Sequence, residues 1–108
     1  LILGLTFKEN TPDLRNTRVI DVVHHLEEYG CHVDVADPLA DPDEVCRMFG
    51  RSPVGAPEAA RYDAVVLAVP HAEYIAAGVA ALQDYGKPIQ VFFDLKSAFP
   101  ADDSDLRL

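Results

Sequence analysis

Short apolar runs separated by longer amphipathic segments are the main pattern along this chain. Leu1–Leu5 is apolar throughout, is too short for a helix and ends at polar residues, so it predicts a buried strand. Asp63–Val69 is a second such run and is apolar on both faces, which is typical of a central strand in a parallel sheet. Cys31–Ala36 alternates like a strand, and Ile89–Asp94 predicts the last core strand.

Segments with helical spacing lie between these runs. A helix is predicted to start after Thr17, which would cap its amino end, and to end near Gly30. A short helix is expected over residues 41–49 and is closed by Gly50. The alanine-rich stretch 71–85 predicts another helix.

Strands that alternate with helices predict a three-layer, Rossmann-like α/β domain with a mainly parallel sheet and helices on both faces. Residues 51–61 resemble a linker, but too little chain flanks them for two cores, so we expect one domain over residues 1–99. The acidic tail, residues 100–108, is expected to fray. In such sheets ligands bind beyond the carboxyl ends of the strands. These ends fall at residues 6–16, 37–38, 70–71 and 95–97.

The charge of the chain limits its partners. Nine Lys and Arg against eighteen Asp and Glu give a net charge of −9, which disfavours nucleic acids and anionic membranes. No apolar run reaches the roughly 18–20 residues of a membrane span. The chain opens without Met inside an expected strand, which suggests a piece of a longer protein. Cys31 and Cys46 have no metal-binding spacing and are expected to be reduced thiols, with a disulfide as the alternative.

The loop over residues 6–16 differs from a dinucleotide-binding turn because it contains no glycine. It offers Lys8 and Arg15 instead, two cations suited to phosphate or carboxylate groups, with Asp13 placed to orient Arg15. A solvated loop with incidental charges is the alternative.

Two polar residues at other strand ends have open roles. Asp37 stands where a ribose-binding acid would lie, and it can equally cap a turn with Pro38. His71 could donate to a ligand or bond a neighbouring loop.

Four segments, in order and at similar spacing, resemble the C-terminal domain of the UDP-glucose/GDP-mannose dehydrogenase family. Gly4–Thr17 is similar to the family's opening segment, where a strand ending in Gly precedes Phe-Lys, then Asp-x-Arg, then a small hydroxyl residue. Val33–Pro38, Tyr62–Tyr74 and Phe92–Lys96 resemble its later strands, the last with Asp-x-Lys/Arg. The first segment is most like the branch that oxidises UDP-N-acetylhexosamines for surface polysaccharides.

The resemblance implies roles for individual residues. Phe7 and Lys8 would contact the UDP part of a nucleotide sugar, and Lys96, where the family often has Arg, would also touch it. Arg15 would reach NAD bound by a neighbouring domain. Lys8 and Lys96 should therefore converge on a diphosphate.

The resemblance also implies that this chain is part of a cytoplasmic NAD-dependent UDP-sugar 6-dehydrogenase, which would be a homo-oligomer in its full-length form. The family's N-terminal domain binds NAD and a central region supplies a catalytic Cys, and neither matches this sequence. Cys31 and Cys46 lie away from the carboxyl-end loops, so the chain alone is expected to be inactive.

Two other functions are compatible with a small acidic α/β domain. A phospho-receiver domain needs an acidic pair after the first strand, where this chain has Leu5-Thr6, so that function is disfavoured. A non-catalytic nucleotide- or CoA-binding module remains the alternative.

Overall fold

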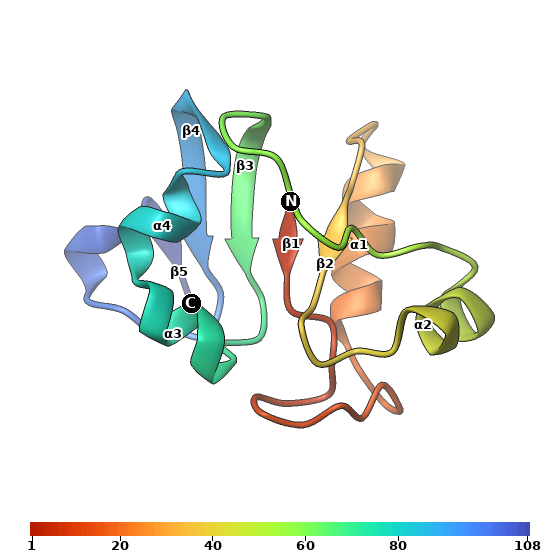
Figure 1. Cartoon of the computed structure of the whole chain (residues 1–108). Coiled ribbons are helices and arrows are strands. Elements are labelled where there is room, and N and C mark those ends of the chain that lie inside the picture. Colours follow the sequence, from red (N-terminus) through yellow and green to blue (C-terminus); the bar gives the residue numbers. More distant parts are fainter.

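A single parallel sheet organises the computed structural model, which describes all residues from Leu1 to Leu108. The strands lie in the order β2-β1-β3-β4-β5, and every neighbouring pair is parallel. Their bounds are Ile2–Leu3 (β1), Val35–Ala36 (β2), Tyr62–Leu67 (β3), Gly86–Asp94 (β4) and Leu106–Arg107 (β5). In Figure 1 the arrowheads of β1, β3 and β4 therefore point to the same edge of the sheet.

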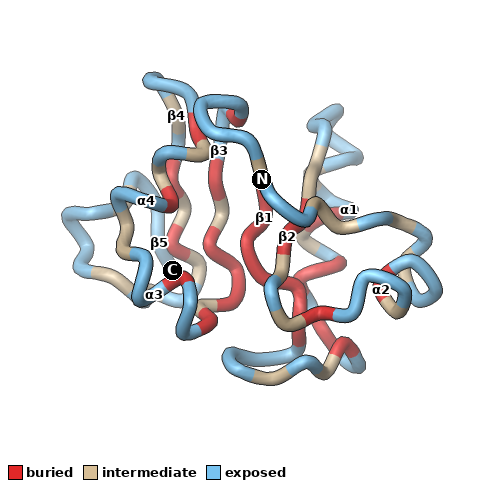
Figure 2. The backbone as a smooth tube through the Cα atoms, viewed as in Figure 1, coloured by how far each residue is buried: buried red, intermediate tan, exposed pale blue.

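Helices cover both faces, as the alternation of strands and helices predicted. Their bounds are Val19–Glu28 (α1), Pro42–Phe49 (α2), Ala72–Ala77 (α3) and Val79–Gln83 (α4), with a 3₁₀ turn over Ala101–Asp103. One core cluster joins α1 to Ile2 of β1, and the other joins Tyr74 and Leu82 to Leu3 and Phe92. Since neighbouring strand residues point to opposite faces, α1 and the α3–α4 pair lie on opposite sides of the sheet. In Figure 2 the buried parts of the backbone, in red, lie mainly at the centre of the molecule. The predicted three-layer α/β fold is confirmed.

The short helix α2 follows its local sequence signals. Asp41 accepts the backbone N–H of Asp43 at 2.9 Å, Pro42 occupies the first helical position, and Gly50 ends the helix in the left-handed region at φ +67°. These three signals act within a few residues of each other, so they needed no tertiary context.

Two predicted elements are shorter or divided. The strand expected over residues 31–36 keeps only Val35–Ala36, because β1 pairs with it from Ile2 onward and residues 31–33 extend beyond Leu1. The helix expected over residues 71–85 is split at Gly78, whose φ of +86° and ψ of 159° interrupt the helical backbone. None of the four α-helices combines the length and the hydrophobicity that a membrane span requires.

The tail that was expected to fray instead extends the sheet. Leu106–Arg107 forms β5, which pairs in parallel with Phe93 and Asp94 of β4. Asp105 exchanges bonds with Phe92, since its backbone N–H donates to the Phe92 carbonyl and its carboxylate accepts the Phe92 N–H. The acidic composition of the tail gave no indication of this pairing. From the sequence alone, a carboxylate that accepts a backbone N–H cannot be distinguished from a solvated carboxylate.

Thr17 acts one position away from its predicted role as a cap. The helix α1 begins at Val19, with Arg18 at the cap position. The Thr17 hydroxyl accepts the Val19 N–H at 3.3 Å and donates to the Leu5 carbonyl at 2.7 Å. It therefore ties the start of α1 to the end of β1.

Gly4 sets how closely β1 approaches the end of β3. Its φ is +94°, and a Cβ at this position would lie 2.6 Å from Val69 Cβ and 2.7 Å from Val69 N. Only glycine combines this backbone conformation with this contact.

We expect Gly4→Ala to lower the free energy of unfolding by about 2–4 kcal/mol, because strain from the positive φ adds to overpacking. Gly30→Ala is the matched control, since Gly30 has a φ of +89° and a Cβ added there would meet nothing within 4 Å. That control should lose only about 1 kcal/mol. Urea denaturation measures both, and equal losses would show that the contact with Val69 is unimportant.

Candidate functional site

A cavity of about 340 Å³ lies at the carboxyl edge of the sheet, where β1, β3 and β4 end beside the start of α1. It brings together the loops after three strands and the first turn of a helix, as the topology predicts for a ligand site. Its lining residues are Phe7, Lys8, Glu9, Arg18, Val19, Val22, Ala68, Val69, Leu95 and Lys96. Phe7, Lys8 and Lys96, predicted from opposite ends of the chain, thus line one cavity.

The charge of this cavity is opposite to that of the whole chain. Lys8, Arg18 and Lys96 face a single carboxylate, that of Glu9, in a protein with a net charge of −9. The amino end of α1, at Val19, adds the positive end of a helix dipole. Because salt screens charges beyond about 8–10 Å, the nearby cations dominate here.

Two other cavities lack this excess of positive charge. One of about 300 Å³, between α3–α4 and residues 53–57, is lined by Asp37 and Glu73 and by no basic residue. Another of about 560 Å³, at the amino ends of β1 and β3, is lined by two aspartates, one arginine and the amino-terminal residue Leu1 with its ammonium group. The cavity beside Lys8 is therefore the best candidate for binding an anion.

The walls of the candidate cavity are largely apolar. Phe7 is 54% exposed despite its size, and it lies next to Lys8 in sequence. Val19 and Val22 of α1 and Leu95 after β4 supply further apolar surface. The arrangement suits a ligand with both a flat apolar part and an anionic part.

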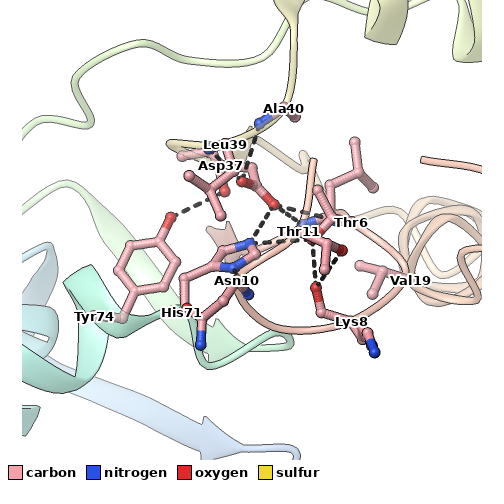
Figure 3. Close-up of polar contacts among 12 residues, drawn as sticks. Thr6, Lys8, Asn10, Thr11, Val19, Asp37, Leu39, Ala40, His71 and Tyr74 are labelled. Atoms are coloured by element: carbon pink, nitrogen blue, oxygen red, sulfur yellow. Dashed lines mark hydrogen bonds and ion pairs between the residues drawn. The ribbon is translucent and has the colours of Figure 1, made fainter. Parts of the chain in front are cut away.

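Backbone bonds give the loop over residues 6–16 its shape. The Phe7 N–H donates to the Asp13 carbonyl at 2.7 Å, which closes the loop on itself. The Lys8 carbonyl accepts the hydroxyls of Thr6 at 3.0 Å and Thr11 at 3.2 Å. Figure 3 shows both bonds converging on Lys8. Lys8 is thus fixed through its backbone while its side chain remains free for a ligand.

A buried carboxylate fastens this loop to the end of β2. One oxygen of Asp37 accepts the N–H groups of Leu5 at 2.7 Å and Thr6 at 3.1 Å. The other accepts the N–H groups of Leu39 at 2.8 Å and Ala40 at 3.2 Å. Both oxygens are used, so Asp37 caps turns, and its side chain has no exposed surface left to bind a ribose.

His71 connects the same loop to the start of α3. Its ring is fully buried, with Nε2 2.9 Å from the Asp37 carboxylate and 3.2 Å from the Thr6 hydroxyl. Its Nδ1 accepts the Asn10 N–H at 2.9 Å. The loop-bonding interpretation of His71 is therefore the one that the geometry supports.

The second lysine is held by another buried carboxylate. Asp94, at the end of β4, accepts the N–H groups of Ala98 at 2.9 Å and Phe99 at 2.8 Å. The turn places Ser97 in the left-handed region, at φ +53°. Lys96 lies inside this turn, so Asp94 fixes the backbone that presents it.

Arg15 does not line the cavity with Lys8. Its guanidinium pairs with both oxygens of Asp13, at 3.1 and 3.2 Å, which confirms the predicted orienting role of Asp13. These hydrogen bonds lower the pKa of Asp13. The Arg15 side chain is 80% exposed, so it presents a planar cation to solvent on the outer side of the loop.

Arg18 and Glu9 are lining residues that the sequence did not single out. Arg18 precedes α1 and bonds weakly to Asp21, at 3.5 Å, with its side chain 91% exposed. The position of Arg18 in the sequence, just before the first helix after β1, could have indicated this role, since that helix must start at the edge of the sheet where ligands bind. Cys31 and Cys46 are free thiols, in agreement with the prediction; both are exposed, and neither lines the cavity.

Comparison with known proteins places the whole chain. Residues 1–101 match the UDP-glucose/GDP-mannose dehydrogenase family, UDP binding domain. The chain is 48% identical over 108 residues to a UDP-N-acetyl-D-glucosamine 6-dehydrogenase of Salmonella typhi, covering 100% of this chain and 25% of that protein. It is 46% identical to the protein of that name from Pseudomonas aeruginosa, covering 100% of this chain and 26% of the relative. It is 41% identical over 105 residues to Protein CapL of Staphylococcus aureus, covering 94% of this chain and 24% of the relative. The chain thus spans about a quarter of the length of these relatives.

The bonds to Asp37 predict a pH dependence of stability. Burial alone would raise the pKa of Asp37, but the hydrogen bonds from His71 and from the backbone of Leu5 and Leu39 lower it below its ordinary value of 3.8. A carboxyl group with a depressed pKa stabilises the fold above its unfolded pKa, and this stabilisation is lost as the pH falls through the folded pKa.

We therefore expect Asp37→Asn to cost about 2–3 kcal/mol of unfolding free energy at neutral pH, because an amide NH₂ would face backbone N–H donors. The difference from the unsubstituted chain should persist down to pH 3.8 and shrink below it. Asp102→Asn, an exposed carboxylate, is the control. Denaturation at a series of pH values measures this, and a constant difference at all pH values would contradict it.

Proposed function

Because the chain belongs to the UDP-glucose/GDP-mannose dehydrogenase family, as its UDP binding domain, we propose that it holds the UDP part of a nucleotide sugar in the cavity beside Lys8 and Lys96. The observation that carries this proposal is the meeting of two lysines, one from each end of the chain, in a single cavity. Each cation can donate to a phosphate oxygen in a charge-assisted hydrogen bond.

The residues that line the cavity suit a ligand with an anionic part and a flat apolar part. Lys8, Lys96 and Arg18 supply positive charge to the lining, and the amino end of α1 also favours an anion. Phe7 and the apolar wall offer a surface for a flat ring. The diphosphate would contact the cations, and the uridine or the sugar would pack against Phe7.

NAD, the cofactor that the family implies, does not fit the first loop of this chain. Residues 6–16 contain no glycine for a close approach of the pyrophosphate, and both oxygens of Asp37 are used by backbone groups. We propose that NAD binds mainly to another domain of the parent protein. Arg15, exposed on the outer side of the loop, would then reach it.

For the parent protein we propose an NAD-dependent UDP-sugar 6-dehydrogenase that oxidises the sugar C6 alcohol to a carboxylate. The support is the likeness to the UDP-N-acetyl-D-glucosamine 6-dehydrogenases, of which this chain spans a quarter. The nucleophile and the hydride acceptor would come from the other three quarters, so this chain alone should be inactive. We place the parent enzyme in the cytoplasm as a homo-oligomer; exposed, unpaired Cys31 and Cys46 fit a reducing compartment.

Titration of this chain with UDP, followed by amide NMR, tests the binding site. We expect shifts in residues 6–16 and 95–97, and about tenfold weaker binding in Lys8→Ala and in Lys96→Ala, since each loses a charged hydrogen bond. Uridine should bind more weakly than UDP and with less dependence on salt.

Lys87→Ala is the matched control for both lysine variants. Lys87 lies at the opposite end of β4 and pairs with Asp63 at 2.9 Å, so its removal should leave UDP binding unchanged. The site is wrong if millimolar UDP shifts neither loop, or if CoA, which lacks the uracil ring, binds as tightly as UDP.

Arg15 is tested in the full-length enzyme. We expect Arg15→Ala to raise the KM for NAD about tenfold and the KM for the nucleotide sugar much less, because the arginine lies outside the cavity. Arg47→Ala, on the exposed side of α2, is the control. A larger effect on the sugar nucleotide than on NAD would refute this assignment.

A further inference from the structure

We propose that His71 is a positioning residue for the ligand loop: as a neutral imidazole with its proton on Nε2, it anchors Asn10 and thereby holds Lys8 at the cavity. The link to ligand binding rests on the proposed UDP site, whereas the anchoring of the loop does not. His71 itself does not line the cavity, so any effect it has on a ligand passes through the loop.

The hydrogen bonds on Nδ1 determine the state of the ring. The Asn10 N–H donates to His71 Nδ1 at 2.9 Å, so Nδ1 carries no proton. Asn10 also accepts the Ala72 N–H on its side-chain oxygen, at 2.8 Å. Two bonds thus join Asn10 to consecutive residues at the start of α3, as Figure 3 shows for the His71 contact.

The other ring nitrogen must then be the donor. His71 Nε2 lies 2.9 Å from an oxygen of Asp37, which can only accept when it is ionised. The Thr6 hydroxyl, 3.2 Å from Nε2, uses its own proton on the Lys8 carbonyl and so can also accept. Every group around the ring is satisfied by this one tautomer, and a proton on Nδ1 would set two donors against each other.

The anchor lies next to the residue that matters for the ligand. Asn10 is two residues from Lys8 and has a left-handed backbone, with φ at +64°, a conformation that needs support from its surroundings. Thr6, which bonds the Lys8 carbonyl, also lies against Nε2. His71 therefore constrains the loop on both sides of Lys8. Without it, the loop would have to lose more conformational freedom when a ligand binds.

Two substitutions separate the two ring nitrogens. His71→Asn leaves an oxygen near the position of Nδ1 that can accept the Asn10 N–H. His71→Gln leaves an amide near the position of Nε2 that can donate to Asp37, but it removes the acceptor for Asn10. We expect His71→Gln to weaken UDP binding by this chain about tenfold and His71→Asn by no more than about threefold. His24→Gln and His24→Asn, on the exposed side of α1, are the matched controls.

A double-substitution cycle tests whether the effect passes through Lys8. In a Lys8→Ala background, His71→Gln should weaken UDP binding by less than about twofold, because there is no ammonium group left to position. A general loss of folding would instead weaken binding equally in both backgrounds, and this result would overturn the proposal. So would equal effects of His71→Gln and His71→Asn.

Two measurements without ligand test the anchoring of the loop by His71 independently of the proposed UDP site. Nitrogen NMR of the imidazole should report a proton on Nε2 and none on Nδ1, and hydrogen exchange at the Asn10 amide should be faster in His71→Gln than in His71→Asn. If this chain binds no UDP but both results hold, the proposed function fails and the loop anchor stands. A proton on Nδ1, or equal exchange in both variants, would overturn the anchor itself.

Discussion

Two buried carboxylates control the geometry of the ligand edge. A carboxylate removed from water must be satisfied by donors, and Asp37 and Asp94 find them in backbone N–H groups of loops that follow the strands. The loops are fixed as a consequence, and each carries one of the two lysines, Lys8 and Lys96. Carboxylates outside the cavity thus hold the backbone of the two lysines that line it.

This arrangement explains how a strongly acidic chain can offer an anion site. A net charge of −9 would repel UDP at long range, but screening by salt makes the nearest few charges decisive. Asp37 and Asp94 are absent from the cavity lining, where three cations face Glu9. Outside the cavity, the carboxylates of Asp37 and Asp94 accept backbone N–H groups, and Asp13 is paired with Arg15.

The sequence predicted what depends on local signals and on topology. The bounds of α2 followed from Asp41 and Gly50. The family resemblance selected Lys8 and Lys96, and the rule that parallel strands end at one edge of the sheet predicted that they lie close together. The break in the helix lies at a glycine, Gly78, through which the prediction ran, whereas the strand β5 depends on its pairing with β4, which no local pattern shows. The role of His71 is open in the sequence for the same reason, since its partners lie more than thirty residues away.

The most direct test is a crystal structure of this chain with UDP bound. We expect a diphosphate within hydrogen-bonding distance of the Nζ atoms of both Lys8 and Lys96, with the loop over residues 6–16 unchanged and the uridine beside Phe7. A diphosphate bound in the cavity between α3–α4 and residues 53–57, with both ammonium groups in solvent, would contradict it.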